Sequence, residues 1–94
     1  MIRMENWSIV QLGVDPYQPP EVQPQGLNGN VFGHPRFPDG EQVTTTAIVS
    51  GATCDGRITV RTRSGSEYEL GDVSADYEGL FPGARERVAK RFVA

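Results

Sequence analysis

The chain has 94 residues, of which 37% are apolar and 22% are charged, and its formal net charge is −3. This length predicts one domain, residues 1–94, with a modest core, and it leaves open a dimer that shares apolar surface. The negative charge disfavours a general DNA-backbone binder, because such a protein needs a basic footprint. The eleven glycines and seven prolines are typical of a turn-rich β-protein rather than a helical one.

Two features bear on the cellular compartment. Cys54 is the only cysteine, which excludes an internal disulfide and suits a reducing cytoplasm. The first ten residues lack the long apolar run of a signal peptide, and no stretch approaches the length of a membrane span. We therefore expect a cytoplasmic protein that does not associate with membranes.

The first third of the chain predicts one strand and a long connection. Residues 7–12, WSIVQL, predict a first strand at an edge of the sheet. Residues 14–26 carry four prolines and cannot donate a continuous ladder of hydrogen bonds, so we expect an extended polyproline II segment that wraps the domain. The alternative is a Pro-rich ligand for an aromatic groove. Asn28-Gly29 predicts a turn before a short strand at residues 30–32.

Residues 33–41, GHPRFPDGE, predict a restricted connection into the rest of the sheet. The residues that precede Pro35 and Pro38 are confined to extended conformations. Asp39-Gly40 then predicts a turn. We expect Phe37 to plug the open end of the sheet.

Residues 40–71 predict the centre of the fold, an antiparallel meander of three strands. The strands are expected at residues 42–50, 57–63 and 67–70, which are rich in β-branched residues or alternate between apolar and polar. Asp55-Gly56 predicts a two-residue turn between the first two strands. That turn places four side chains of the first strand on the inner face: Val43, Thr45, Ala47 and Val49.

Side-chain parity selects the connection of the second hairpin. A two-residue turn at Ser64-Gly65 would set Val60 opposite Glu69, an apolar side chain against a charged one. A three-residue loop, residues 63–65, with a left-handed Gly65 avoids this conflict. It pairs like with like and acid with base: Val60 with Tyr68, Ile58 with Leu70, and Arg61 with Glu67. We therefore predict the three-residue loop.

The C-terminal part predicts helix. Ser74 is expected to cap one helical turn that runs through Tyr77, after which Leu80 and Phe81 return to the core. Residues 82–94 predict a helix with an apolar side chain at every fourth position. That stripe consists of Ala84, Val88 and Phe92, and the basic residues that complement the helix dipole are Arg87, Lys90 and Arg91. The expected fold is mainly β, a small bent antiparallel sheet or partly open barrel with a C-terminal α-helix.

No set of catalytic or ligating residues stands out. His34 is the only histidine and precedes a proline in a loop, whereas Cys54 is expected in a hairpin tip. A nucleophile and base need direct contact and a third group that orients them, and one histidine with one cysteine makes a weak transition-metal site. We expect a non-enzymatic protein without cofactor or metal, and no role follows for His34 or Cys54.

Acidic residues gather in one part of the chain. Between Arg63 and Arg85 there are five acids and no base. Clustered carboxylates can mimic a phosphate backbone and engage an Arg- or Lys-lined surface, and two aromatic residues would supply the apolar centre of that interface. The predicted partner-binding residues are Glu67, Glu69, Asp72, Asp76, Tyr77, Glu78 and Phe81. The alternative is a solvated acidic loop.

Nucleic acid is the second possible partner. Three arginines of one strand share its outer face, as in small barrels that bind single strands: Arg57, Arg61 and Arg63. Glu67 and Glu69 partly neutralise them, and Tyr68 is expected to point inward. Single-strand binding is therefore the alternative function, and a self-assembling structural or virion component is the third.

About half of the chain resembles small proteins from phages, prophages and other mobile elements. The resemblance is carried by a Phe-x-Asp-Gly loop, a Thr-rich strand, a Ser-Gly-Ser-x-Tyr-x-Leu-Gly run and a nearby Asp-Tyr pair. The matching residues are Phe37, Asp39, Gly40, Ser64, Gly65, Ser66, Tyr68, Leu70, Gly71, Asp76 and Tyr77. Some mobile-element proteins of this size are anti-CRISPR inhibitors. The resemblance thus implies an inhibitor that docks on a host defence complex, such as a type I CRISPR interference complex, and blocks a basic surface that receives nucleic acid. It carries over no binding residue.

Overall fold

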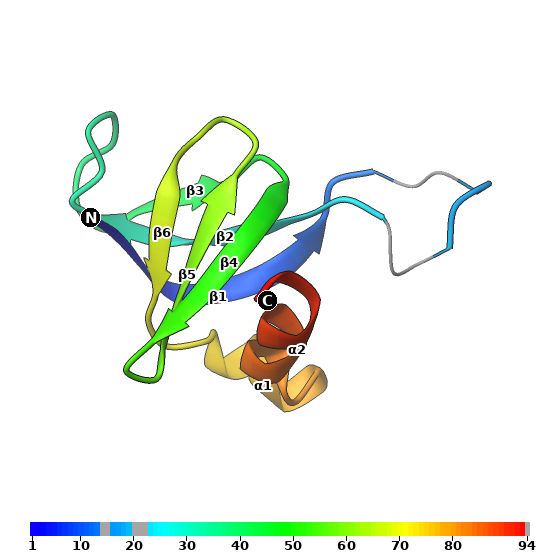
Figure 1. Ribbon diagram of the computed structural model, residues 1–94. Helices are drawn as coiled ribbons and strands as arrows, with labels where there is room; N and C mark the ends of the chain where they lie inside the picture. Colours follow the sequence, from blue (N-terminus) through cyan, green and yellow to red (C-terminus); the bar gives the residue numbers. More distant parts are fainter. Residues whose placement is uncertain (14–15, 20–22, 94) are drawn as a thin grey trace.

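The computed structural model describes residues 1–13, 16–19 and 23–93. Within these residues six strands form one sheet in the order β3-β2-β1-β6-β5-β4, and two short helices follow it in the chain (Figure 1). The strands are β1 Ile2–Gln11, β2 Gln25–Phe32, β3 Glu41–Thr44, β4 Ile48–Cys54, β5 Arg57–Thr62 and β6 Glu67–Leu70. The helices are α1 Ala75–Leu80 and α2 Ala84–Phe92.

The hairpin of β5 and β6 has the predicted register. Val60 lies opposite Tyr68, and the other two predicted pairs form as well. The connection turns at Gly65, which has a φ of 92° and donates its N–H to the Thr62 carbonyl at 2.9 Å. The three-residue loop is confirmed, and the buried face of the hairpin is free of charged side chains because of it.

The hairpin of β4 and β5 has the predicted turn but a shifted inner face. The two-residue turn at Asp55-Gly56 is confirmed, with positive φ at both residues. A β-bulge just before Ser50 moves the register by one residue, so Ile48 rather than Val49 lies opposite Thr62. Val49 is 53% exposed, and the prediction that it faces the core is wrong. Alternation alone does not reveal such a bulge, because it inserts one unpaired residue.

The single strand predicted at residues 42–50 is wrong. The segment divides into β3 and β4, which form the two opposite edges of the sheet, and residues 45–47 link them. The link forms hydrogen bonds to β2 on one side and to the residue that follows β5 on the other. The Thr45 N–H donates to the Leu27 carbonyl at 2.8 Å, and the Ala47 carbonyl accepts the Arg63 N–H at 2.7 Å. Thr45 and Ala47 are buried, as predicted.

The short link shows how strongly the sheet is bent. A flat sheet of six strands would separate its edges by roughly 24 Å, at about 4.8 Å per strand spacing. The chain between the end of β3 and the start of β4 covers at most roughly 14 Å. The sheet therefore curls until its edges approach each other without closing, which makes it a partly open barrel.

β1 lies inside the sheet, so the predicted edge position of residues 7–12 is wrong. It pairs antiparallel with β2 and parallel with β6, so the sheet is mixed where we expected only antiparallel pairs. A bulge at Asn6 and Trp7, with a φ of 54° at Asn6, sets both residues against Gly29. Trp7 is fully buried, and its indole Nε1 donates to the Gly71 carbonyl at 2.9 Å.

β2 is longer than predicted. Asn28-Gly29 lies inside the strand and pairs with β3, so the predicted turn there is wrong. The Pro-rich segment, residues 14–26, falls partly outside the described residues. In its described part, residues 16–19 lie away from the sheet (Figure 1), and Tyr17 is 94% exposed. The last two residues of the segment belong to β2.

The first helix begins as predicted and ends differently. Ser74 caps α1, because its hydroxyl accepts the Tyr77 N–H. Leu80 is 76% exposed and Phe81 is 55% exposed. The prediction that these two residues return to the core is therefore wrong, and they form an apolar projection between the helices.

The second helix covers one face of the curled sheet. Ala84 and Val88 are buried in the core and Phe92 is half-buried, which confirms the predicted apolar stripe. α2 packs against β4, and Val93, the residue after the helix, bridges to Gly51. The core contains eleven clustered side chains: Met4, Trp7, Leu27, Val31, Ile48, Ile58, Val60, Tyr68, Leu70, Ala84 and Val88.

The predicted fold class, mainly β with a bent, partly open sheet and a C-terminal helix, is confirmed. The radius of gyration is 12.7 Å, close to the roughly 12.4 Å expected of a compact domain of this length. Among the described residues, no helix has the length and apolar character needed to cross a membrane.

Candidate functional site

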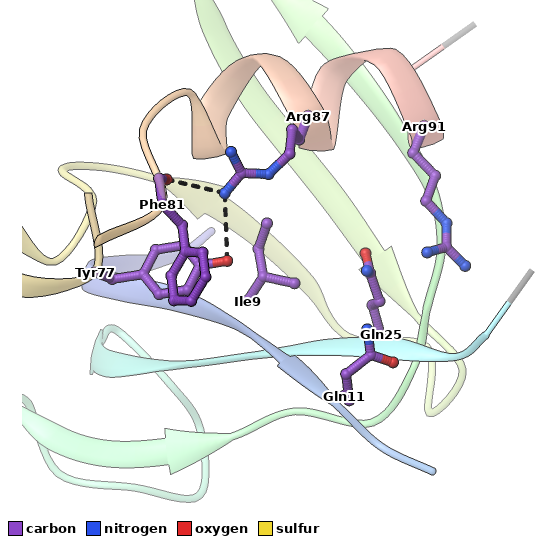
Figure 2. A pocket seen from close by; sticks show the side chains of 7 residues that line it. All are labelled: Ile9, Gln11, Gln25, Tyr77, Phe81, Arg87 and Arg91. Carbon is purple, nitrogen blue, oxygen red and sulfur yellow. Dashed lines mark hydrogen bonds between the residues drawn. The ribbon is translucent and has the colours of Figure 1, made fainter. Parts of the chain in front are cut away.

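A groove of about 600 Å³ lies where the two helices meet the end of β1 and the start of β2 (Figure 2). We call it the arginine groove. Its lining consists of Ile9 and Gln11 from β1, Gln25 from β2, Tyr77 from α1, Phe81 after α1, and Arg87 and Arg91 from α2. Residues far apart in the sequence therefore build one surface.

One wall of the groove is aromatic. Tyr77 and Phe81 are four residues apart, the spacing that brings side chains together over one helical turn. Their ring centroids are 5.3 Å apart (Figure 2). Because Phe81 and the neighbouring Leu80 are more than half exposed, this wall presents apolar surface to solvent.

Arg87 is fixed against this wall. Its Nη2 donates to the Phe81 carbonyl at 3.0 Å and to the Tyr77 hydroxyl at 3.4 Å, and its Nη1 donates to the Pro82 carbonyl. The guanidinium carbon lies 6.0 Å from the Tyr77 ring centroid, within the range of a cation–π contact. All these partners are neutral, so none of them neutralises the positive charge of Arg87.

Arg91 lies on the same side of α2, one turn further on. Its Nη2 donates to the Gln23 carbonyl, and its guanidinium lies 5.1 Å from the Phe92 ring centroid. The described part of the chain contains two ion pairs, neither of which involves Arg87 or Arg91. Among the residues that the structure describes, no carboxylate lines the groove. It therefore presents two guanidinium charges beside exposed aromatic rings.

The predicted acids on β6 face outward and meet arginines. Glu69 accepts a hydrogen bond from Arg57 at 3.2 Å, and the pair is one of the two ion pairs in the described chain. Glu67 is exposed and lies opposite Arg61. This outer face of the sheet therefore mixes both signs of charge, as the sequence predicts.

The remaining predicted acids lie after β6 and on α1. Asp72 and Asp76 are exposed. The Glu78 carboxylate accepts the N–H of Gly83 at 2.7 Å and that of Ala84 at 3.4 Å, so it caps the start of α2. The structure thus brings Tyr77 and Phe81 together and distributes the five acids over β6, the following connection and α1.

His34 and Cys54 make no contact with each other among the described residues. Cys54 is exposed, and its Sγ lies 3.9 Å from an Asp55 carboxylate oxygen. Phe37 packs on His34 and is 36% exposed, outside the buried core, so the prediction that it plugs the sheet is wrong. The described residues hold no group of three or more His, Cys, Asp or Glu side chains placed to bind a metal ion.

Sequence reasoning identified the aromatic wall but not the residues that face it. Arg87 and Arg91 are assigned by sequence to the dipole of the last helix. Their spacing of four residues, on one face of a helix, is a pattern that could mark them as a pair. The contributions of Ile9, Gln11 and Gln25 depend on where the sheet places the ends of β1 and β2, which no local pattern encodes.

Comparisons with protein-family models, curated proteins and solved structures found no match. The functional argument therefore rests on the geometry of the site.

Proposed function

We propose that the protein is a non-enzymatic, cytoplasmic protein-binding module that contacts its partner through the arginine groove. The observation that supports this is the joint exposure of aromatic, aliphatic and guanidinium groups in one place. Phe81 and Leu80 are exposed, and Arg87 is held against Tyr77. Aromatic residues and arginine are the types enriched at the centres of protein interfaces, and a soluble monomer rarely exposes such apolar groups together without use.

Charge complementarity supports a partner segment that carries carboxylates. A guanidinium binds a carboxylate through two parallel hydrogen bonds, and neither Arg87 nor Arg91 is engaged by a carboxylate in the described chain. Gln11 and Gln25 add amide donors and acceptors at the other wall of the groove. The groove thus suits an extended segment with an apolar side chain on Phe81 and an acidic one near Arg91.

The resemblance to mobile-element proteins supports a host defence complex as the partner, with inhibition by steric cover. If the target surface is basic, the acidic residues would make the contact instead. Of these, Glu67, Asp72 and Asp76 are exposed, but Glu69 is paired with Arg57 and Glu78 caps α2. We therefore prefer the groove as the contact surface and keep the acidic residues as the competing outcome of the test.

The proposal predicts that a photo-reactive residue next to Phe81, at the border of the groove, captures the partner. Leu80 is replaced by p-benzoylphenylalanine, and the protein is irradiated in an extract of its source cells or with a purified type I interference complex. We expect an adduct from position 80 and none from the same label at Val49, which is also exposed but lies on β4. Mass spectrometry then identifies the partner and the segment contacted.

Affinity for the identified partner separates the two surfaces. Phe81→Ala and Arg91→Glu are each expected to weaken binding at least about tenfold, and the affinity of the parent should fall as salt rises. Lys90→Glu makes the same charge change on α2 outside the groove and should leave the affinity unchanged. Loss of binding in Asp72→Lys and Asp76→Lys, with Phe81→Ala unaffected, would show that the acidic residues form the interface.

A further inference from the structure

A second hollow, of about 400 Å³, lies beside the loop that follows β2. We call it the loop hollow, because the β2–β3 loop, residues 33–40, meets the β3–β4 link and the β5–β6 loop there. The two linings share no residue in the described ranges of the chain. The loop hollow is therefore a separate candidate site, to which the proposed function gives no role.

One wall of the loop hollow consists of aromatic rings. The His34 ring meets the Phe37 ring edge to face, with centroids 4.7 Å apart, and lies 6.2 Å from the Tyr68 ring. The Phe37 residue is 36% exposed, so part of its ring is open to solvent. An exposed ring beside a hollow is a platform for stacking another flat ring.

Hydrogen-bond donors surround this platform. Arg36 and Ser66 line the hollow, and neither the Arg36 guanidinium nor the Ser66 hydroxyl has a hydrogen-bond or ion-pair partner in the described part of the chain. His34 Nδ1 accepts the Arg36 N–H at 3.0 Å, so a neutral ring carries its proton at Nε2, which faces the Tyr68 hydroxyl at 3.5 Å. The Tyr68 hydroxyl proton is then left for another acceptor.

The loop that carries Arg36 and Phe37 is held in place before any ligand arrives. Pro35 and Pro38 flank the two residues and restrict the backbone. The Asp39 carboxylate accepts the Gly33 N–H at 2.8 Å, and the Gly40 N–H donates to the Val31 carbonyl at 2.7 Å. A braced loop loses little conformational entropy on binding, which favours affinity for a small ligand.

We propose that the loop hollow binds a nucleotide, with the base stacked on Phe37 and the phosphate held by Arg36. Two hydroxyl donors and one guanidinium suit an acceptor-rich anion, and the exposed ring suits a flat base. The volume lies in the range of small-ligand sites, about 300–1,000 Å³. The arginines on the outer face of β5 are less suited, because Glu69 pairs with Arg57 and Glu67 lies opposite Arg61.

His34, the only histidine, provides a single ring signal for a test by NMR. Isotope-labelled protein is titrated with two full probes, adenosine 5′-monophosphate and an oligothymidylate. It is also titrated with the two parts of the mononucleotide, inorganic phosphate and adenosine, each alone. We expect adenosine 5′-monophosphate or the oligothymidylate to shift the His34 signal saturably. Phosphate alone and adenosine alone should each bind more weakly. Equal affinity for the two full probes indicates a free nucleotide, whereas much tighter oligothymidylate binding indicates a single strand.

Variants separate the two contacts. Phe37→Ala should weaken binding at least about fivefold, the lower end for one stacked base. Arg36 is exposed, and Arg36→Ala should remove the preference for the monophosphate over adenosine. Arg61→Ala, a charge deletion on the outer face, and Phe81→Ala, in the arginine groove, should bind nucleotide as the parent does. The proposal is overturned if neither full probe shifts His34 at millimolar concentration, or if Arg36→Ala and Phe37→Ala bind like the parent.

Discussion

Gly29 is the residue that makes room for the bulge in β1. A Cβ built there would lie 2.8 Å from Met4 Cγ, 2.9 Å from the Glu5 carbonyl oxygen and 3.0 Å from Trp7 Cα. Two of these atoms belong to the backbone, which cannot move aside as a flexible side chain can. Gly29→Ala is therefore expected to lower the free energy of unfolding by about 2 kcal/mol, as in other overpacked sites, measured from urea denaturation.

Gly79 provides the matched control. It lies within α1, and no atom comes within 4 Å of a Cβ built there. Gly79→Ala should keep the stability of the parent or raise it by about 0.5–1 kcal/mol, since glycine is the poorer helix former. Equal denaturation midpoints for Gly29→Ala and the parent would contradict the bulge geometry.

At the scale of an element, the β5–β6 hairpin depends on the left-handed backbone of Gly65. Its φ is 92°, and a Cβ there would meet no other atom within 4 Å, so a substitution is opposed by backbone strain alone. Gly65→Val is expected to cost about 1–2 kcal/mol, measured by thermal or urea unfolding. Gly13→Val, at a site equally open but without a positive φ, should change the stability much less.

The register of this hairpin can be predicted from sequence because its two strands are close together in the chain. Val60 and Tyr68 are close in the chain, and only one loop length puts both on the buried side, so parity decided the register. The bulge before Ser50 was invisible because it shifts pairing without a change in composition. The break at residues 45–47 was missed for a related reason, since Thr45 and Ala47 remain hydrogen-bonded and buried like strand residues.

Contacts between distant segments could not be predicted in this way. The sequence predicts residues 7–12 as an edge strand, since no local pattern indicates the parallel pairing of β1 with the distant strand β6. The same holds for the candidate site. The sequence predicts Tyr77 and Phe81 as an aromatic pair, but Arg87 and Arg91 share a groove with them because of how α2 follows α1, where Glu78 caps the start of α2.

At the scale of the whole molecule, Trp7 joins the two halves of the sheet, β3-β2-β1 and β6-β5-β4. It lies on β1, its indole bonds to the Gly71 carbonyl after β6, and its backbone bridges to Val73. Unfolding should therefore be a single cooperative transition. We expect the fluorescence of Trp7, the only tryptophan, and far-UV circular dichroism to give the same urea midpoint. An earlier transition by fluorescence would show that β1 and β6 separate while the rest stays folded.

The parallel pairing of β1 with β6 also has a consequence for synthesis on the ribosome. Translation delivers β1 first and β6 after all the other strands. At about 5–20 residues per second, the nascent β1 therefore has β2 beside it for roughly 2–8 seconds before its second neighbour exists. During that interval the Trp7 indole has no Gly71 carbonyl to bond. Productive folding must therefore await release of nearly the whole polypeptide, and a prematurely terminated product that ends before residue 67 would expose an unpaired strand to chaperones and proteases.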